Sequence, residues 1–147
     1  MQEIFSHEWF MREALKEAKK AFDLGEVPVG AVVVCNNAII GKGHNLTEQL
    51  HDVTAHAEMQ AITAACNYLG AKYLTDCTLY VSLEPCLMCA GAIFWSRPSI
   101  LVFGSSDKKR GFTMHAENLL HPKTEIISGI MNQESEQLLK DFFKKLR

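Results

Sequence analysis

Alternating helical and extended hydrophobic patterns define the first half of the chain. Residues 7–24 place apolar side chains at three- and four-residue steps, which is typical of an amphipathic helix. Residues 27–35 form an apolar, β-branched run that predicts a buried strand, and an Asn-Asn turn leads into a partner strand over residues 38–44. We expect a helix from about residue 55 to 67, with Thr54 as its cap.

The second half continues with strands and helices in alternation. We expect a strand at 78–82, a helix with Pro85 in its first turn and Pro98 beyond its end, strands at 100–104 and 124–128, and a closing helix at 134–146. Helices that alternate with strands after a hairpin predict an α/β fold, a three-layer α-β-α sandwich around a central mixed five-stranded sheet. The length of 147 residues suits one domain over residues 1–147.

Composition narrows the class of protein without identifying it. The chain is 48% hydrophobic and 22% charged with a net charge of −2, so it is not a generally basic RNA-coating protein, although a local basic patch remains compatible. The opening MQEIFSHEWF lacks the apolar core of a secretory signal, and no apolar run reaches the roughly 18 residues of a membrane span. Five cysteines without a disulfide-like spacing fit a reducing cytoplasm. We therefore expect a cytoplasmic protein with no membrane association.

Two short motifs carry the candidate chemistry. They are His56-Ala57-Glu58 and, roughly thirty residues later, Pro85-Cys86-Leu87-Met88-Cys89. One imidazole and two thiolates can supply three ligands to a tetrahedral Zn²⁺ and leave the fourth position to water, as in catalytic zinc sites. Cys86 and Cys89 fall at an expected helix start, where the dipole favours the metal-binding thiolate. The motifs predict one zinc ion per subunit, held by His56, Cys86 and Cys89.

Glu58 gives this predicted site a catalytic rather than a structural character. Zinc would lower the pKa of water in the fourth position toward ~7. Glu58 would take that proton and pass it to a ring nitrogen and then to a leaving amino group. A structural zinc site would use four protein ligands, and the remaining cysteines and histidines lie at unhelpful spacings. This pattern indicates a zinc-dependent hydrolase that deaminates nucleobases.

The resemblance to a known family extends well beyond these motifs. The stretches that resemble bacterial tRNA adenosine deaminases, in matching order and spacing, are EVPVGAVVV (26–34), HDVTAHAEMQAI (51–62), TLYVSLEPCLMCAGAI (78–93), LVFGSSDKKRG (102–111) and LLKDFFKKLR (138–147). The resemblance implies a cytidine deaminase-like fold and a homodimer. It also implies the conversion of adenosine to inosine at the wobble position of a tRNA anticodon.

The same resemblance implies roles for residues outside the zinc motifs. Asn45 and the backbone of Ala57 would contact the target base, Pro28 and Val29 would lie under the pocket floor, Leu83 and Glu84 would line the pocket, and Asp107 would contact the nucleotide's sugar. Cations and aromatic rings that would contact the RNA of an anticodon stem-loop are Lys108, Lys109, Arg110, Phe142, Phe143, Lys144 and Arg147.

Departures from the family pattern concern the substrate rather than the zinc chemistry. The family usually has a small-residue run such as G-A-A-G-S where this chain has Gly111-Phe112-Thr113-Met114-His115, and the chain ends at Arg147, short of the lysine-rich tail of some relatives. Two other functions are therefore kept open. The first is a guanine or cytosine deaminase acting on free bases or nucleosides, with which residues 91–97 are compatible. The second is a zinc-stabilised RNA-binding module without catalysis, which would not need Glu58.

Overall fold

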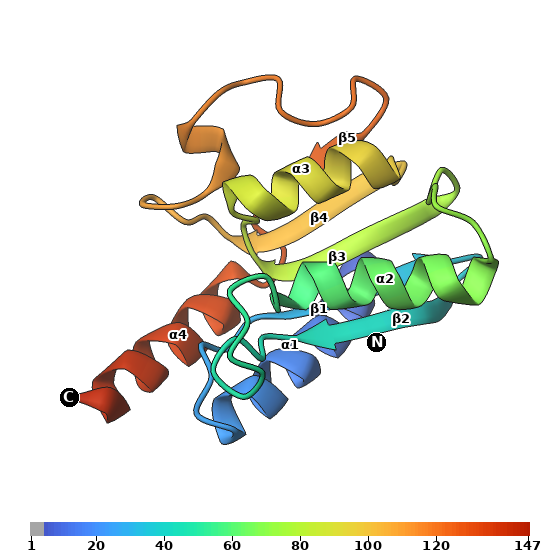
Figure 1. The fold of residues 1–147 in the computed structure, drawn as a ribbon. Helices are drawn as coiled ribbons and strands as arrows, with labels where there is room; N and C mark the ends of the chain where they lie inside the picture. Colours follow the sequence, from blue (N-terminus) through green and yellow to red (C-terminus); the bar gives the residue numbers. More distant parts are fainter. Residues whose placement is uncertain (1–4) are drawn as a thin grey trace.

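A mixed β-sheet forms the middle layer of the molecule, and helices cover both of its faces (Figure 1). The computed structural model describes residues 5–147. Its elements are α1 (His7–Asp23), β1 (Gly30–Cys35), β2 (Ala38–His44), α2 (Ala57–Leu69), β3 (Cys77–Leu83), α3 (Leu87–Ser96), β4 (Ile100–Ser105), the 3₁₀ turn η1 (Phe112–Met114), β5 (Glu125–Ile127) and α4 (Asn132–Leu146).

The strand order β2-β1-β3-β4-β5 confirms the predicted five-stranded mixed sheet. The β1–β2 hairpin is antiparallel, and β1 also pairs antiparallel with β3. Asn36 and Asn37 connect the hairpin with φ angles of 51° and 60°, a conformation that asparagine tolerates and that suits a tight hairpin turn. β3 and β4 are parallel, with α3 as the crossover between them, and β5 continues parallel to β4.

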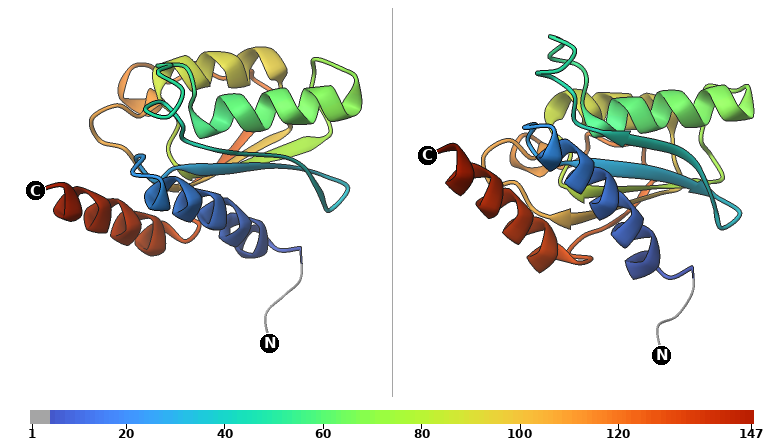
Figure 2. Two further views of the ribbon diagram at one scale, coloured as in Figure 1. Left: turned by 60° about the horizontal axis from the view of Figure 1, so that its bottom comes forward. Right: turned by 90° about the horizontal axis from the view of Figure 1, so that it is seen from below.

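The two helical layers confirm the predicted three-layer sandwich. α2 and α3 lie on one face of the sheet, while α1 and α4 lie on the other (Figure 2). Successive strand residues point to opposite faces, so Ala31 and Val33 of β1 join the core under α2 and α3, whereas Val32 and Val34 join the core under α1. This alternation between two buried faces explains why β1 is apolar at every position.

Three expected boundaries were wrong by a few residues. β1 begins at Gly30 rather than Val27, because Pro28 has no N–H to donate and the N–H of Val29 bonds the carbonyl of Val27 at 2.9 Å. The cap of α2 is His56 rather than Thr54, whose N–H and hydroxyl both donate to Asp52. Pro85 precedes the N-cap of α3 instead of lying within its first turn.

The expectation that the chain has no membrane-spanning segment can be compared with the helices of the structure. No helix among residues 5–147 combines the length and the apolar character needed to cross a bilayer. Residues 1–4, which belong to the stretch that carries the expectation about a secretory signal, lie outside the described residues.

Candidate zinc-binding and catalytic site

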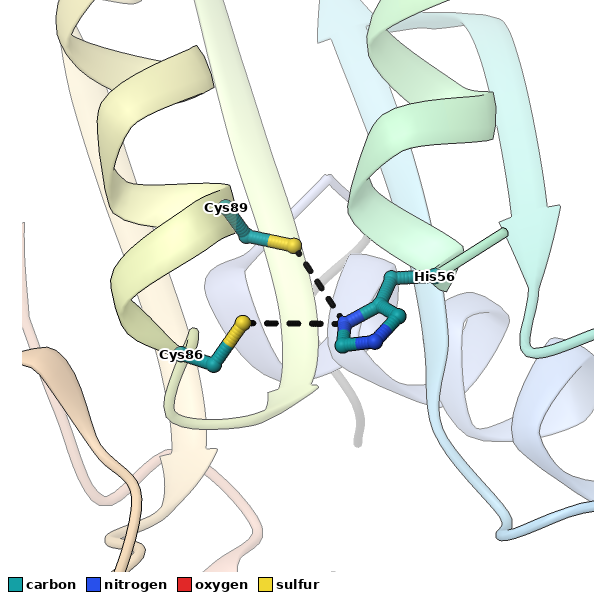
Figure 3. A group of neighbouring side chains, drawn as sticks. All are labelled: His56, Cys86 and Cys89. Atoms are coloured by element: carbon teal, nitrogen blue, oxygen red, sulfur yellow. Dashed lines mark hydrogen bonds between the residues drawn. The ribbon is translucent and has the colours of Figure 1, made fainter. Parts of the chain in front are cut away.

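The three predicted zinc ligands lie together between the starts of α2 and α3 (Figure 3). Nδ1 of His56 is 3.7 Å from Sγ of Cys86 and 3.5 Å from Sγ of Cys89, and all three donor atoms lie within 4.8 Å of one another. Donors at three corners of a tetrahedron, with bonds of about 2.0 Å to nitrogen and 2.3 Å to sulfur, stand roughly 3.5–3.8 Å apart. The donor set and its spacing therefore fit Zn²⁺.

The two helix starts present these donors to each other. His56 is the N-cap of α2 and Cys86 is the N-cap of α3, each with extended backbone, while Cys89 lies in the first turn of α3 and is fully buried. Within the described chain, neither N-cap side chain bonds a helix N–H, unlike an ordinary serine or asparagine cap. The imidazole and the thiol thus remain available to a metal.

Without a metal, the three donors share protons. A hydrogen bond from the Cys89 thiol, supported by His56, lowers the pKa of Cys86 to about 3. The neighbouring Cys86 and burial raise the pKa of Cys89, and the hydrogen bond to Cys86 raises the pKa of His56. A metal binds the deprotonated forms, so its binding must displace the proton from Cys89.

Glu58 lies in the first turn of α2 and is only 3% exposed. Burial raises the pKa of its carboxyl to about 7, and charges on His56 and Cys86 act on it in opposite directions. A carboxyl with a pKa near neutrality can both accept and donate a proton at physiological pH. The structure therefore places a buried carboxyl of raised pKa two residues after His56, and its role as a proton carrier stays a prediction.

Two glycines of β2 set the position of α2. A Cβ atom at Gly41 would overlap the backbone oxygen of Ala61, and one at Gly43 would overlap that of Ala57. Gln60 adds a hydrogen bond from its side-chain amide to the carbonyl of His44 at 2.7 Å. These contacts hold the segment that carries His56 and Glu58 against the sheet, and nothing in the local sequence pattern pointed to them.

The predicted base-contacting segment adjoins this site. The N–H of Asn45 donates to the carbonyl of Val29 at 3.1 Å, which brings Asn45 next to Pro28 and Val29. The N–H of Leu46 donates to the carbonyl of Ala55 at 3.0 Å and so ties the segment to the start of α2. The Asn45 side chain is 8% exposed, and its amide bonds the Val27 carbonyl and the Thr47 N–H, each at 3.3 Å.

The carboxylate of Glu84, a residue expected to line the pocket, is bonded within the protein, and its place in the pocket stays a prediction. Leu83 is half-buried, whereas Glu84 is 4% exposed and its carboxylate accepts hydrogen bonds from Asp107 and Thr113. Asp107 is half-buried and accepts hydrogen bonds from the N–H groups of Lys109 and Arg110. Lys108, Lys109 and Arg110 are exposed on this turn, as expected of cations that meet RNA.

The predictions that involve two aromatic residues have to be corrected, because both side chains are buried. Phe142 is 5% exposed because its ring packs against Phe22, so it is not available to RNA, whereas Phe143 is 45% exposed and Lys144 and Arg147 are exposed. Phe112, part of the departure from the family pattern, is 2% exposed and packs against Phe103. That part of the departure therefore concerns the core and not the substrate.

Comparison with protein families and with curated proteins gives one consistent result. Residues 5–105 match the model of the cytidine and deoxycytidylate deaminase zinc-binding region. The tRNA-specific adenosine deaminase of Aquifex aeolicus is 47% identical, with 95% of each chain covered. The enzyme of the same name from Bacillus subtilis is 48% identical and covers 95% of this chain and 90% of its own.

Solved structures agree on the fold. One from a study of A-to-I editing by tRNA A34 deaminases at the wobble position has 41% identity and a TM-score of 0.83, covering 88% of this chain and 98% of its own. A guanine deaminase from Bacillus subtilis has 45% identity and a TM-score of 0.66, but the match covers 69% of this chain and 65% of its own. The zinc donors, the buried Glu58 and these matches agree, and the chain belongs to the tRNA-specific adenosine deaminases of the zinc-dependent deaminase superfamily.

Proposed function

We propose that this protein hydrolyses adenosine to inosine at the wobble position of a tRNA anticodon. The observation that carries the proposal is Glu58, a buried carboxyl beside three donors that fit zinc, in a chain that matches tRNA-specific adenosine deaminases over nearly its whole length. Matches to guanine deaminases support the alternative less. The Bacillus subtilis structure covers 69% of this chain and 65% of its own, and the Nitrosomonas europaea structure, which covers 92% of this chain, is 24% identical and shows the fold alone.

The proposed mechanism assigns separate tasks to the residues of this site. His56, Cys86 and Cys89 would hold one zinc ion per subunit, which when bound supplies an acidified water as the nucleophile. Glu58 would accept a proton from that water and deliver it to the ring nitrogen of adenine. It would then carry the remaining proton of the added hydroxyl group to the amino group, so that ammonia leaves and the carbon keeps the oxygen as a carbonyl. Burial keeps the carboxyl away from bulk water and favours its protonated form, so that it can hold the proton between the two transfers.

Substrate binding would use the segments on either side of the zinc donors. Asn45 and the backbone of Ala57 would hold the flipped base, with Pro28, Val29 and Leu83 forming the apolar walls. Asp107 would meet the sugar, and the exposed Lys108, Lys109 and Arg110 would meet phosphates. Phe143, Lys144 and Arg147 would extend this surface along α4. Binding through phosphates predicts an affinity that falls as salt rises.

We also propose a homodimer that forms through the helical layer around the site. Large apolar side chains are exposed on the loop before α2 and along α3, where Val53 is 83% and Trp95 is 68% exposed, together with Leu50, Leu87 and Met88. Burial of such a surface between two copies would stabilise the dimer. Residues 1–147 would act as one domain, in the cytoplasm where tRNA is available and the thiols stay reduced.

The test is inosine formation on a synthetic anticodon stem-loop with adenosine at the wobble position, alongside ammonia release from free guanine, cytosine and adenosine. We expect inosine on the RNA alone, abolished in Glu58→Ala while zinc is retained. Turnover of a free base with none on the RNA would overturn the substrate assignment and leave the zinc chemistry intact. RNA binding without either product would point to the non-catalytic alternative.

A further inference from the structure

Glu84 directs its buried carboxylate at a single loop. Oε1 accepts a hydrogen bond from the N–H of Asp107 at 3.1 Å. Oε2 accepts two more, from the N–H of Thr113 at 3.0 Å and from its hydroxyl at 2.7 Å. Both carboxylate oxygens therefore hold the two ends of the segment 107–113, which leaves them engaged by the protein rather than turned toward a substrate.

Neighbouring contacts attach the same loop to the backbone of the zinc motif. The N–H of Phe112 donates to the carbonyl of Pro85 at 2.9 Å, and Gly111 forms an isolated antiparallel bridge with Cys86. The ring of Phe112 is buried against the core. A Cβ atom at Gly111 would overlap the Glu84 carboxylate, although its φ of −63° suits any residue, so close packing against Glu84 is what requires a glycine here.

This loop carries the side chains that the proposed function assigns to the RNA. Asp107 caps the turn by accepting hydrogen bonds from the N–H groups of Lys109 at 3.1 Å and Arg110 at 3.0 Å, so the basic residues and Asp107 form one rigid turn. Glu84 holds that turn and lies two residues before the zinc ligand Cys86. Glu84 is therefore the side chain that ties both ends of the turn to the segment of the metal donors, beside the backbone contacts of Gly111 and Phe112.

We infer that Glu84 is a positioning residue, which fixes the Asp107 loop relative to the zinc donors so that the nucleotide's sugar and the reacting base are held at the right separation. The inference rests on the proposed function for the identity of the substrate. The placement of the loop by Glu84 is independent of it. Loss of this placement weakens a contact to the sugar that is made before and during the reaction, so it should appear chiefly as a higher KM.

The chain contains a matched control for this arrangement. Glu26 is fully buried, and its carboxylate accepts hydrogen bonds from the N–H groups of Glu48 at 3.0 Å and Gln49 at 2.7 Å. It holds a different loop, the one that follows Asn45. Glu84→Gln and Glu26→Gln therefore make the same chemical change, each at a buried carboxylate that anchors one loop.

The experiment measures loop stability and catalysis in the same variants. Amide hydrogen exchange at Asp107 and Thr113 is followed by NMR, zinc content is measured, and KM and kcat are determined on the anticodon stem-loop. We expect Glu84→Gln to speed exchange at both amides by about 10-fold or more and to raise KM by a similar factor, with zinc retained and kcat less affected. Glu26→Gln should speed exchange at Glu48 and Gln49 and leave the two amides of the Asp107 loop unchanged.

A milder pair of variants keeps the test valid if Glu84→Gln does not fold. Thr113 is exposed, so Thr113→Val removes only the hydroxyl bond and should show part of the Glu84→Gln effect, while Thr113→Ser keeps the bond and should behave as the unchanged protein. Unchanged exchange and unchanged KM in Glu84→Gln and Thr113→Val would overturn the inference, and so would loss of zinc with a fall in kcat alone. If the unchanged protein forms no inosine, the proposed function fails, and the exchange measurements still decide the role of Glu84.

Discussion

The chemistry at the residue scale depends on the buried Glu58. Glu58→Gln keeps the size of the side chain but cannot carry a proton, so we expect inosine formation to fall by about 10²–10⁴-fold with zinc content unchanged. Single-turnover inosine formation and metal analysis measure the two effects. The exposed Glu125→Gln serves as the control, and a Glu58→Gln protein that keeps full activity would contradict the assigned role.

The raised pKa of Glu58 also makes the metal-free protein sensitive to pH. The pKa of its carboxyl is about 7 in the folded chain and 4.5 without burial, so between these values the folded state keeps a proton that the unfolded state has lost. The contribution of Glu58 to stability should therefore fall as pH rises from about 4.5 to 7, by roughly 3 kcal/mol, while Cys86, whose pKa is lowered to about 3, contributes a slope of the opposite sign over the same range. Urea unfolding of chelated protein across this range measures the slope. Glu58→Gln should remove the falling contribution and so shift the slope toward stability that rises with pH, and an equal slope in that variant would show that Glu58 does not contribute.

The sequence identifies candidate site residues where their spacing along the chain is typical of one kind of site. His56, Cys86 and Cys89 form motifs because ligands near helix starts must lie a fixed number of residues apart. The hydrogen bonds of Glu84 and the burial of Phe112 could not be predicted, because they depend on contacts that form only in the folded chain. The composition of those segments does not show which of their side chains turn inward.

At the scale of elements, α2 packs directly on the backbone of β2 at Gly41 and Gly43. We expect Gly43→Ala to cost about 1–3 kcal/mol of stability and to weaken zinc binding, because the added methyl group would displace the backbone of Ala57 next to His56. Thermal unfolding and competition with a chelator measure these changes. Gly91→Ala in α3 is the matched control, since nothing lies within 4 Å of the added Cβ and alanine is the better helix former. A stable Gly43→Ala protein with unchanged zinc affinity would show that α2 can shift freely.

Elements were predictable where one pattern governs a whole segment. The period of α1 and the Asn-Asn hairpin were read correctly, since amphipathic spacing and turn chemistry are local. Helix starts were harder to locate because α2 and α3 have the candidate metal ligands His56 and Cys86 in the cap position. The usual N-cap residues carry a hydroxyl, carboxylate or carboxamide group, which is why the sequence favoured Thr54 over His56 as the cap of α2.

At the scale of the whole molecule, zinc would link two segments that lie about thirty residues apart in the sequence. His56 comes from the helix that follows the hairpin, and both cysteines come from the crossover between β3 and β4. We expect chelation to lower the melting temperature and zinc to restore it, because an ion that binds only the folded chain stabilises it. Rebinding should release at least one proton per zinc ion, since the pKa of Cys89 is raised in the metal-free site. Calorimetry in buffers of different ionisation enthalpy measures the protons, and a value of zero would contradict the shared-proton arrangement.

The meeting of His56 with two cysteines about thirty residues away has a practical consequence for anyone who purifies this protein. In an unfolded chain His56 is not held near the thiols of Cys86 and Cys89, whereas the complete three-donor site exists once both helices have docked on the sheet. The ratio of tightly held metal to polypeptide is then a quality measure for a preparation. A substoichiometric ratio that zinc cannot correct would reveal misassembled molecules before any enzyme assay is run.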